Sequence, residues 1–174
     1  MKNNMFSMAT FLSLVVILAA STIMPVLALD DTVQHIATDL DGFVVKFGCC
    51  PDTSVQMQGS ITTESDGTVI LSSQIGNIMI DEKIYALKFE PIGNVSTTSG
   101  DICLTSTSHE QPGVVELIGG DGVVLKGTGV YSWGNALGCP DGDAGFTNFS
   151  GKFRDTQGQM IEFFTGTDSL PIIQ

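Results

Sequence analysis

The acidic loop Asp141-Gly142-Asp143-Ala144-Gly145 carries the most specific metal-binding pattern in the sequence. Carboxylates two residues apart in a glycine-rich loop can both reach one hard cation such as calcium. The loop departs from the calcium-loop pattern, because Gly145 and Phe146 occupy the fifth and sixth positions, where Asp or Asn and then Gly are required. Calcium bound by Asp141 and Asp143 is therefore one interpretation, and the pattern favours the other, an acidic turn without a metal.

Two aromatic residues, Tyr131 and Trp133, alternate along one predicted strand, and Asn135 follows them. Alternate residues of a strand lie on one face, so these three side chains would line the pocket of a sugar or another small ligand. The other interpretation is packing in the core or at its rim. The segment from Gly127 to Tyr131 resembles the glycine-rich strands of small β-barrel isomerases and dirigent-like barrels, a resemblance of too few residues to carry a function across.

The histidines give no catalytic or metal-binding signature. Cys103 and His109 stand six residues apart, whereas a blue-copper site needs two His and a Cys with an axial ligand. His109 is therefore predicted to be a solvated turn residue, and His35 has no partner pattern. The sequence shows no Gly-x-Ser-x-Gly elbow, so a hydrolytic triad has no support.

Paired carboxylates of a hydrolase are an alternative that any acidic sequence offers. Glu116 and Glu162 both interrupt apolar runs, which predicts that they lie on the wet face of half-buried strands. The candidate acids for such a site are Glu64, Glu90, Glu110, Glu116 and Glu162.

The cysteines predict a disulfide-stapled domain. Their number is even, which in an exported chain predicts two disulfides. Of the three possible pairings, the two that tie the Cys49-Cys50 corner to both Cys103 and Cys139 close long loops, and we favour them. Two glycosylation sequons, at Asn94 and Asn148, predict surface exposure and glycosylation in a host that glycosylates.

The N-terminal segment has the pattern of an export signal. Lys2 is followed by no charged residue until Asp30, and an apolar run leads to Val26-Leu27-Ala28, which suits a signal peptidase. We therefore expect a signal peptide over residues 1–28 and one secreted, extracellular domain over residues 29–174. An uncleaved membrane anchor, with the protein at the cell surface, is the alternative, since the uncharged run reaches the roughly 20 residues that span a bilayer.

The formal net charge is −12, with 19 acidic residues against 7 Lys and Arg. Phosphate binding needs a basic stripe, so nucleic acid is not an expected partner. A membrane would be a partner only through the uncleaved signal. The acidity is typical of a solvated surface, and divalent cations or basic surfaces are the partners it would attract.

The domain reads as all-β. From Ser54 onward, alternating or β-branched runs are separated by Gly, Asp and Asn clusters. Asp66-Gly67 predicts a type I′ hairpin turn, and Asp81-Glu82-Lys83 predicts a second hairpin that closes before Pro91. The segment 93–101 is predicted to be a surface loop. Over Asp31–Leu40 the spacing i, i+3, i+4, i+7 favours a short helix over an opening strand.

About eight to ten strands joined by sequential hairpins predict an antiparallel β-sandwich or a small β-barrel. Three functions are compatible with this pattern. The favoured function is that of a non-catalytic binding or surface-structural module. In the interpretation in which Asp141 and Asp143 bind a cation, that cation stabilises the module. The second is a small barrel that binds, isomerises or cyclises a hydrophobic molecule, with Tyr131, Trp133 and a buried Glu lining its interior, and the third is the carboxylate-dependent hydrolase. Unpaired strand edges would also permit self-association.

Overall fold

The structure, a computed structural model, describes residues 30–45, 51–100, 105–137, 144–167 and 172–173. The chain divides into two units, Met1–Asp30 and Asp31–Gln174, and nearly all the described residues belong to the second. All regular structure in the described part of the chain is β-strand, and it contains no helix long and apolar enough to cross a membrane. The strands are β1 Thr32–Val45, β2 Asp52–Thr63, β3 Val69–Leu71, β4 Gln74–Ile80, β5 Lys83–Pro91, β6 Ser96–Gly100, β7 Thr105–Ile118, β8 Val124–Leu137, β9 Ala144–Arg154, β10 Met160–Thr167 and β11 Ile172–Ile173.

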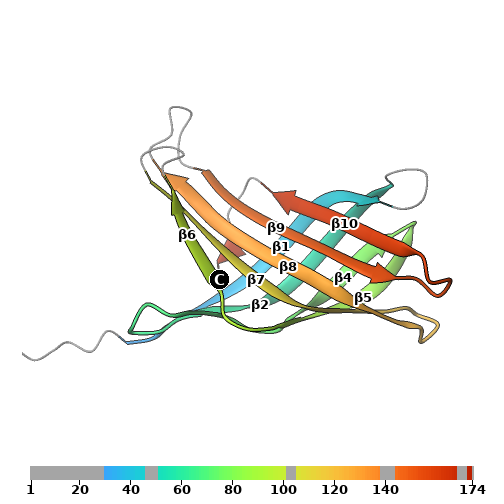
Figure 1. Cartoon of the computed structure of the whole chain (residues 1–174), viewed down its shortest axis with the longest axis horizontal. Coiled ribbons are helices and arrows are strands. Elements are labelled where there is room, and N and C mark those ends of the chain that lie inside the picture. The colour runs from blue at the N-terminus through green and yellow to red at the C-terminus, as the bar shows by residue number, and fades with distance from the viewer. Residues whose placement is uncertain (1–29, 46–50, 101–104, 138–143, 168–171, 174) are drawn as a thin grey trace, which may run out of the picture. The chain divides into compact units, whose positions relative to one another are not determined.

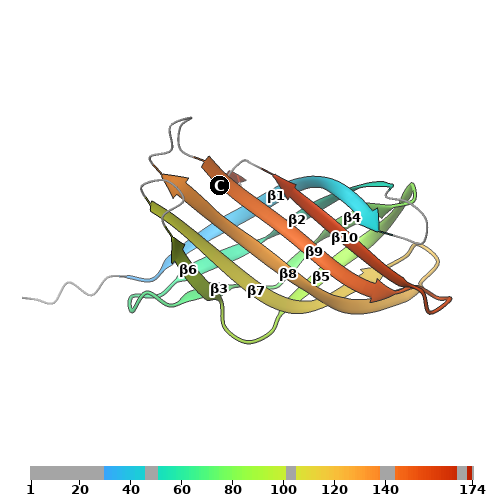
Figure 2. The same cartoon turned by 45° about the horizontal axis from the view of Figure 1, so that its top comes forward.

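Eight of these strands form a closed antiparallel barrel in the order β1-β2-β4-β5-β7-β8-β9-β10, and β10 returns to β1. Figures 1 and 2 show the strands crossing obliquely around a common axis. The short strands β3, β6 and β11 pair with β2, β7 and β1 on the same edges as β4, β5 and β10, so they extend the barrel wall beyond those strands. The all-β prediction is confirmed, and of the two predicted architectures the barrel is the one that forms.

The register defines the size of the barrel. A path that starts at Glu110 on β7 and steps from each residue to its partner on the next strand goes round the barrel and reaches Ile84 on β5. The β5–β7 register, continued by two residues, places Ile84 opposite Gly120. Gly120 is ten residues beyond Glu110, where the path began. An offset of ten over eight strands corresponds to a strand tilt of about 43°, within the range usual for barrels. Barrels of eight strands have interiors that side chains fill or that hold one small ligand.

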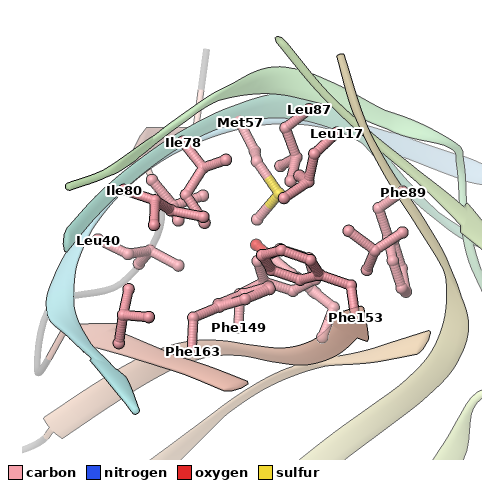
Figure 3. Close-up of a cluster of buried hydrophobic side chains, with 14 of the residues drawn as sticks. Leu40, Met57, Ile78, Ile80, Leu87, Phe89, Leu117, Phe149, Phe153 and Phe163 are labelled. Atoms are coloured by element: carbon pink, nitrogen blue, oxygen red, sulfur yellow. The ribbon is translucent and has the colours of Figure 1, made fainter. Parts of the chain in front are cut away.

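Strict alternation along the strands builds the core. On β1 the buried residues Ile36, Leu40 and Val44 share one face, and Asp39, Asp41 and Phe43 point outward. The other strands alternate in the same way, so apolar side chains from all sides meet on the barrel axis, as Figure 3 shows. Burial of such side chains from water is the main term that stabilises the fold.

A row of three glycines makes room for the aromatic part of this core. Gly113 pairs with Gly129, and Gly129 pairs with Gly151, across β7, β8 and β9. A Cβ at Gly151 would lie 2.6 Å from the ring of Phe163. A Cβ at Gly113 would lie 2.5 Å from the ring of Phe89. The rings therefore occupy the space that side chains on these three strands would otherwise fill.

The predicted N-terminal helix is wrong. Strand β1 runs without interruption from Thr32 to Val45, and it pairs with β2 over twelve residues. Ile36 and Leu40 are four residues apart, and this spacing places two side chains on the same face of a helix and also on the same face of a strand. The apolar pattern that favoured a helix therefore fits a strand as well. Gly42 lies within β1, where a Cβ would lie 1.9 Å from the Phe164 backbone oxygen on β10, so glycine permits this close approach of the two strands.

Two further local predictions need correction. Part of the segment 93–101, predicted as a surface loop, forms β6, and Thr97 pairs with His109. His109 accordingly lies inside β7 and not in a turn. The polar run that suggested a turn is instead the outer end of a long strand with partners on both sides.

The hairpin turns form where predicted, but their types differ. At Asp66-Gly67 only Gly67 has a positive φ, of 88°, and Thr68 N–H donates to Asp66 Oδ1. This is a turn closed by a left-handed glycine, not the type I′ turn predicted there. The two-residue turn with both residues left-handed is Asp81-Glu82, with φ of 50° and 62°.

Candidate functional site

The barrel has two distinct ends. The turns β4–β5, β7–β8 and β9–β10 lie at one end, which we call the turn end, and Thr105 and Leu137 lie at the other, the far end. Paired residues on neighbouring strands do not lie at the same height along the barrel axis, because the offset of ten residues is spread over eight strands. The height changes by about 1.25 residues from each strand to the next. We call residues at the same height a level. This relation assigns every inward-facing side chain to a level.

Five polar side chains face inward at one level near the far end, within about two residue spacings of one another. We call them the polar layer; they are Thr38 on β1, Gln74 on β4, Gln111 on β7, Tyr131 on β8 and Thr147 on β9. All five are buried, and Tyr131, Gln74 and Thr147 are 0% exposed. Gly59 and Pro91 occupy the same level on β2 and β5. The levels toward the turn end are filled mainly by apolar side chains.

Four buried polar atoms have no hydrogen-bond partner within the described residues, and all four belong to the polar layer. They are Thr38 Oγ1, Gln74 Oε1, Tyr131 OH and Thr147 Oγ1. A buried polar atom without a partner costs about 1–3 kcal/mol, so such atoms are rare in folded proteins unless a water or a ligand satisfies them. Three hydroxyls and one amide oxygen at one level therefore define a candidate binding site.

The two glutamines fix the geometry of the layer. Gln111 Nε2 donates to the backbone oxygens of Ile92, at 3.0 Å, and Pro112, at 2.9 Å. Gln74 Nε2 donates to Ser72 O at 2.9 Å. These bonds hold each amide in one orientation. A Cβ at Gly59 would lie 2.0 Å from Gln74 Nε2, so only glycine leaves room for the Gln74 amide.

The layer is uncharged at neutral pH. Burial raises the pKa of Tyr131, and the Thr38 side chain, which lies near the Tyr131 hydroxyl without making a hydrogen bond of normal geometry to it, lowers the pKa by less. Tyr131 therefore remains a protonated phenol, which can donate a hydrogen bond as well as accept one. No described Asp, Glu, Lys or Arg is buried. The chemistry that the layer offers is hydrogen bonding to a neutral group.

An aromatic wall stands above the layer toward the far end. Trp133 lies 5.7 Å from Tyr131, and His109 stacks on Trp133 with ring centroids 5.1 Å apart at 26°. His109 Nδ1 lies 2.9 Å from Thr97 Oγ1 on β6. Burial lowers the pKa of His109, so the ring stays neutral at neutral pH. The wall is therefore planar, largely apolar and uncharged.

Of the predicted ligand residues, the structure brings Tyr131 and Trp133 together. Asn135 shares their inward-facing side of β8 but lies half-buried, two residues nearer the far end. The acids Glu116 and Glu162 lie on the outward face, as predicted, and Glu116 Oε1 is 2.5 Å from Lys126 Nζ. The pattern of alternation thus located the aromatic part of the site.

Several predicted sites fall elsewhere. Asn94 and Asn148 are both exposed, so glycosylation at these sequons stays a prediction. The calcium ligands Asp141 and Asp143 lie outside the described residues, and so do the cysteines Cys49, Cys50, Cys103 and Cys139. Within the described ranges, no three His, Cys, Asp or Glu side chains form a group that could hold a metal ion.

Four of the five members of the polar layer were not predicted as site residues from the sequence. Thr38 fell in the predicted helix, and Gln111 fell next to the predicted turn at His109. Gln74 begins a strand whose apolar residues lie on both faces, so its inward direction was not evident. The alternation of the strands did contain a signal for two of them. Gln111 and Thr147 each lie two residues before a buried, inward-facing residue of the same strand, so they share its inward face.

Compared with protein-family models, with curated proteins and with solved structures, the chain matches none of them. The site must therefore be interpreted from its own geometry.

Proposed function

We propose that this protein is a secreted binding module that holds a small, uncharged molecule in the far-end half of its barrel. The polar layer forms the base of the site, and Trp133 with His109 forms one wall. The observation that carries the proposal is the gathering of four partnerless buried polar atoms at a single level of the barrel.

The hydrogen-bonding inventory defines the class of ligand. Gln74 Oε1 can only accept, so the ligand must present at least one N–H or O–H donor. The three hydroxyls can each donate and accept, so they suit a hydroxyl or an amide. A charged ligand group would be buried without a counter-charge, at a cost of several kcal/mol. The expected ligand therefore has a neutral polar end and a flat apolar body that packs on Trp133.

Fluorescence of Trp133, the only tryptophan in the sequence, tests this proposal. Benzyl alcohol, toluene and benzoate share one ring and differ in the polar group, which is neutral, absent or charged. We expect benzyl alcohol to change the emission saturably, and toluene and benzoate to bind at least about ten-fold more weakly, since leaving the layer unsatisfied costs more than 1 kcal/mol. Equal responses to all three would contradict the proposal.

Export belongs to the same proposal, because it rests on the N-terminal pattern of Lys2, the apolar run and Val26-Leu27-Ala28. The intact mass of the protein recovered from the medium of an exporting host tests it. A chain that begins at Leu29 supports the cleaved signal, and a chain that keeps residues 1–28 and stays with the membrane contradicts it.

A further inference from the structure

A row of side chains crosses the outer face of the barrel from β7 to β1. Each member is paired with the next across neighbouring strands, and we call the set the outer row: Pro112, Val130, Ser150, Phe164 and Phe43. Alternation directs all five away from the core, and all but Ser150 are apolar. Figure 2 shows β7, β8, β9 and β10 side by side, so the row lies on one continuous surface.

The middle of the outer row is concave. A hollow of about 480 Å³ lies there, and Ser150, which has the smallest side chain of the row, is among its lining residues. On the β7 side, Ile92 extends the apolar surface, because its N–H donates to the backbone oxygen of Pro112 at 2.8 Å and so holds it beside the row. On the β1 side, the ring centroid of Phe43 lies 5.6 Å from that of Phe164. The hollow therefore has apolar walls on both sides.

The apolar area of this surface matches what the core of a protein–protein interface needs. Phe43 and Phe164 are 44% and 42% exposed, and Ile92 and Val130 are 56% and 37% exposed. With about 200 Å² for a fully exposed Phe and about 120 Å² for an aliphatic side chain, these four expose roughly 280 Å², and the exposed Pro112 adds to it. A standard interface buries about 800 Å² on each partner, a little over half of it apolar. The outer row with Ile92 supplies the larger part of that apolar area.

The charge of this face differs from that of the protein as a whole. The charged side chains of β8, β9 and β10 all point outward, and they are Lys126, Lys152, Arg154 and Glu162. Lys126 forms an ion pair with Glu116 on β7, so the face is close to neutral, whereas the whole chain has a formal charge of −12. Two copies of the protein therefore repel each other less through this face than through the rest of their acidic surface.

We propose that the outer row is the interface of a symmetric dimer of this chain. A two-fold axis through the face at Ser150 places β8 of one protomer over β10 of the other, because β8 and β10 lie on the two sides of β9. Phe164 of each protomer then packs against Val130 of its partner, and the larger ring enters the hollow beside the smaller side chain. Such two-fold interfaces are the commonest in soluble oligomers, and they close on themselves. This proposal does not depend on the proposed function.

Sedimentation velocity tests the oligomeric state. The protein comes from an exporting host that does not glycosylate, because Asn148 is exposed on the same face and a glycan there would stand between the protomers. Nonreducing electrophoresis confirms that the samples contain no intermolecular disulfide. We expect a monomer–dimer equilibrium over a range of about 5 to about 500 µM, since an interface with this little apolar area binds weakly. Salt at about 0.5 M should strengthen the dimer relative to about 0.05 M, because it screens the repulsion between two acidic chains.

Two substitutions of matched chemistry locate the interface. Val130→Glu takes a carboxylate out of water at the centre of the dimer, so it should raise the dimer Kd at least about ten-fold. Ile75→Glu places the same charge on β4, opposite β9 in the ring, at a side chain that is 61% exposed, and should change the Kd less than about two-fold. Ser150→Arg should weaken the dimer as Val130→Glu does, because two guanidinium groups would meet at the axis. Urea midpoints measured on the monomers verify that all three variants are folded.

A dimer that salt strengthens, that Val130→Glu and Ser150→Arg weaken, and that Ile75→Glu leaves intact supports the proposal. A monomer at every concentration overturns it, and so does equal weakening by Val130→Glu and Ile75→Glu. Association beyond the dimer also overturns it, because a two-fold interface leaves no free copy of itself. If the wild type is monomeric and binds phosphatidylcholine vesicles, and Val130→Glu abolishes that binding, the outer row contacts a lipid surface and not a second copy.

Discussion

Thr147 and Thr165 offer a direct test of the polar layer, because both are buried threonines on neighbouring strands. The Thr147 hydroxyl has no partner among the described residues, whereas the Thr165 hydroxyl donates to the Phe149 backbone oxygen at 2.8 Å. Valine has the same shape as threonine without the hydroxyl. Each substitution therefore changes hydrogen bonding and leaves packing almost the same.

The two substitutions should have opposite effects on the ligand-free protein. Thr147→Val removes a desolvated hydroxyl and should raise the free energy of unfolding by about 1 kcal/mol. Thr165→Val removes a satisfied buried bond and leaves the Phe149 oxygen short of a donor, so it should lower the free energy of unfolding by about 1–2 kcal/mol. For a domain of this size, 1 kcal/mol corresponds to a shift of about 2–4 °C in Tm.

Urea unfolding followed by circular dichroism measures both effects, with the same disulfide state in all samples. An unchanged slope with denaturant would show that the substitutions act on stability and not on the unfolded state. If Thr147→Val destabilised the protein as much as Thr165→Val does, the Thr147 hydroxyl would have a partner in the ligand-free protein, and the polar layer would not be short of hydrogen-bond partners.

Three further predictions concern single positions. Glu82→Gly should raise the free energy of unfolding by about 0.5–1 kcal/mol, because glycine adopts the left-handed φ of the turn without strain; a lower urea midpoint would contradict this. Gly151→Ala should lower the free energy of unfolding by about 1–3 kcal/mol, since its Cβ would lie 2.6 Å from the Phe163 ring. The control Gly120→Ala, at a position with open space around it, should cost less than about 0.5 kcal/mol. Equal losses in the two variants would show that the glycine row is not needed for packing. Burial lowers the pKa of His109 in the folded state, so the unfolded state binds its proton more readily, and stability should fall as the pH drops from about 6.5 through the lower folded pKa. The urea midpoint of His109→Gln should fall less than that of the wild type between pH 7.5 and 5.5, and parallel losses would rule out His109 as the cause.

The sequence was sufficient to predict the strands and most of the turns. Alternation on β2 and β10, and the Gly-Asp clusters between strands, each have a local physical cause. The choice between sandwich and barrel was not local, because it depends on whether β10 returns to β1. That closure involves five residue pairs far apart in the chain, from Asp41–Gly166 to Val45–Glu162.

The polar layer was only partly predictable for a related reason. Tyr131 and Trp133 are recognisable because aromatic residues alternate on one strand. Thr38, Gln74 and Thr147 are ordinary polar residues in their own strands, and they become a site only when the offset of ten brings their strands to a common level. A sequence pattern gives the face of each residue, whereas the level comes from the register of all eight strands.

Isothermal titration of benzyl alcohol into the wild type and into a Thr38→Val, Thr147→Val double variant shows whether the polar layer binds the ligand. Both substitutions remove hydroxyls from the polar layer and leave Trp133 and His109 in place. We expect at least about ten-fold weaker binding to the double variant, which should be as stable as the wild type or more stable. Unchanged affinity in the double variant would contradict the assignment of the polar layer as the binding site.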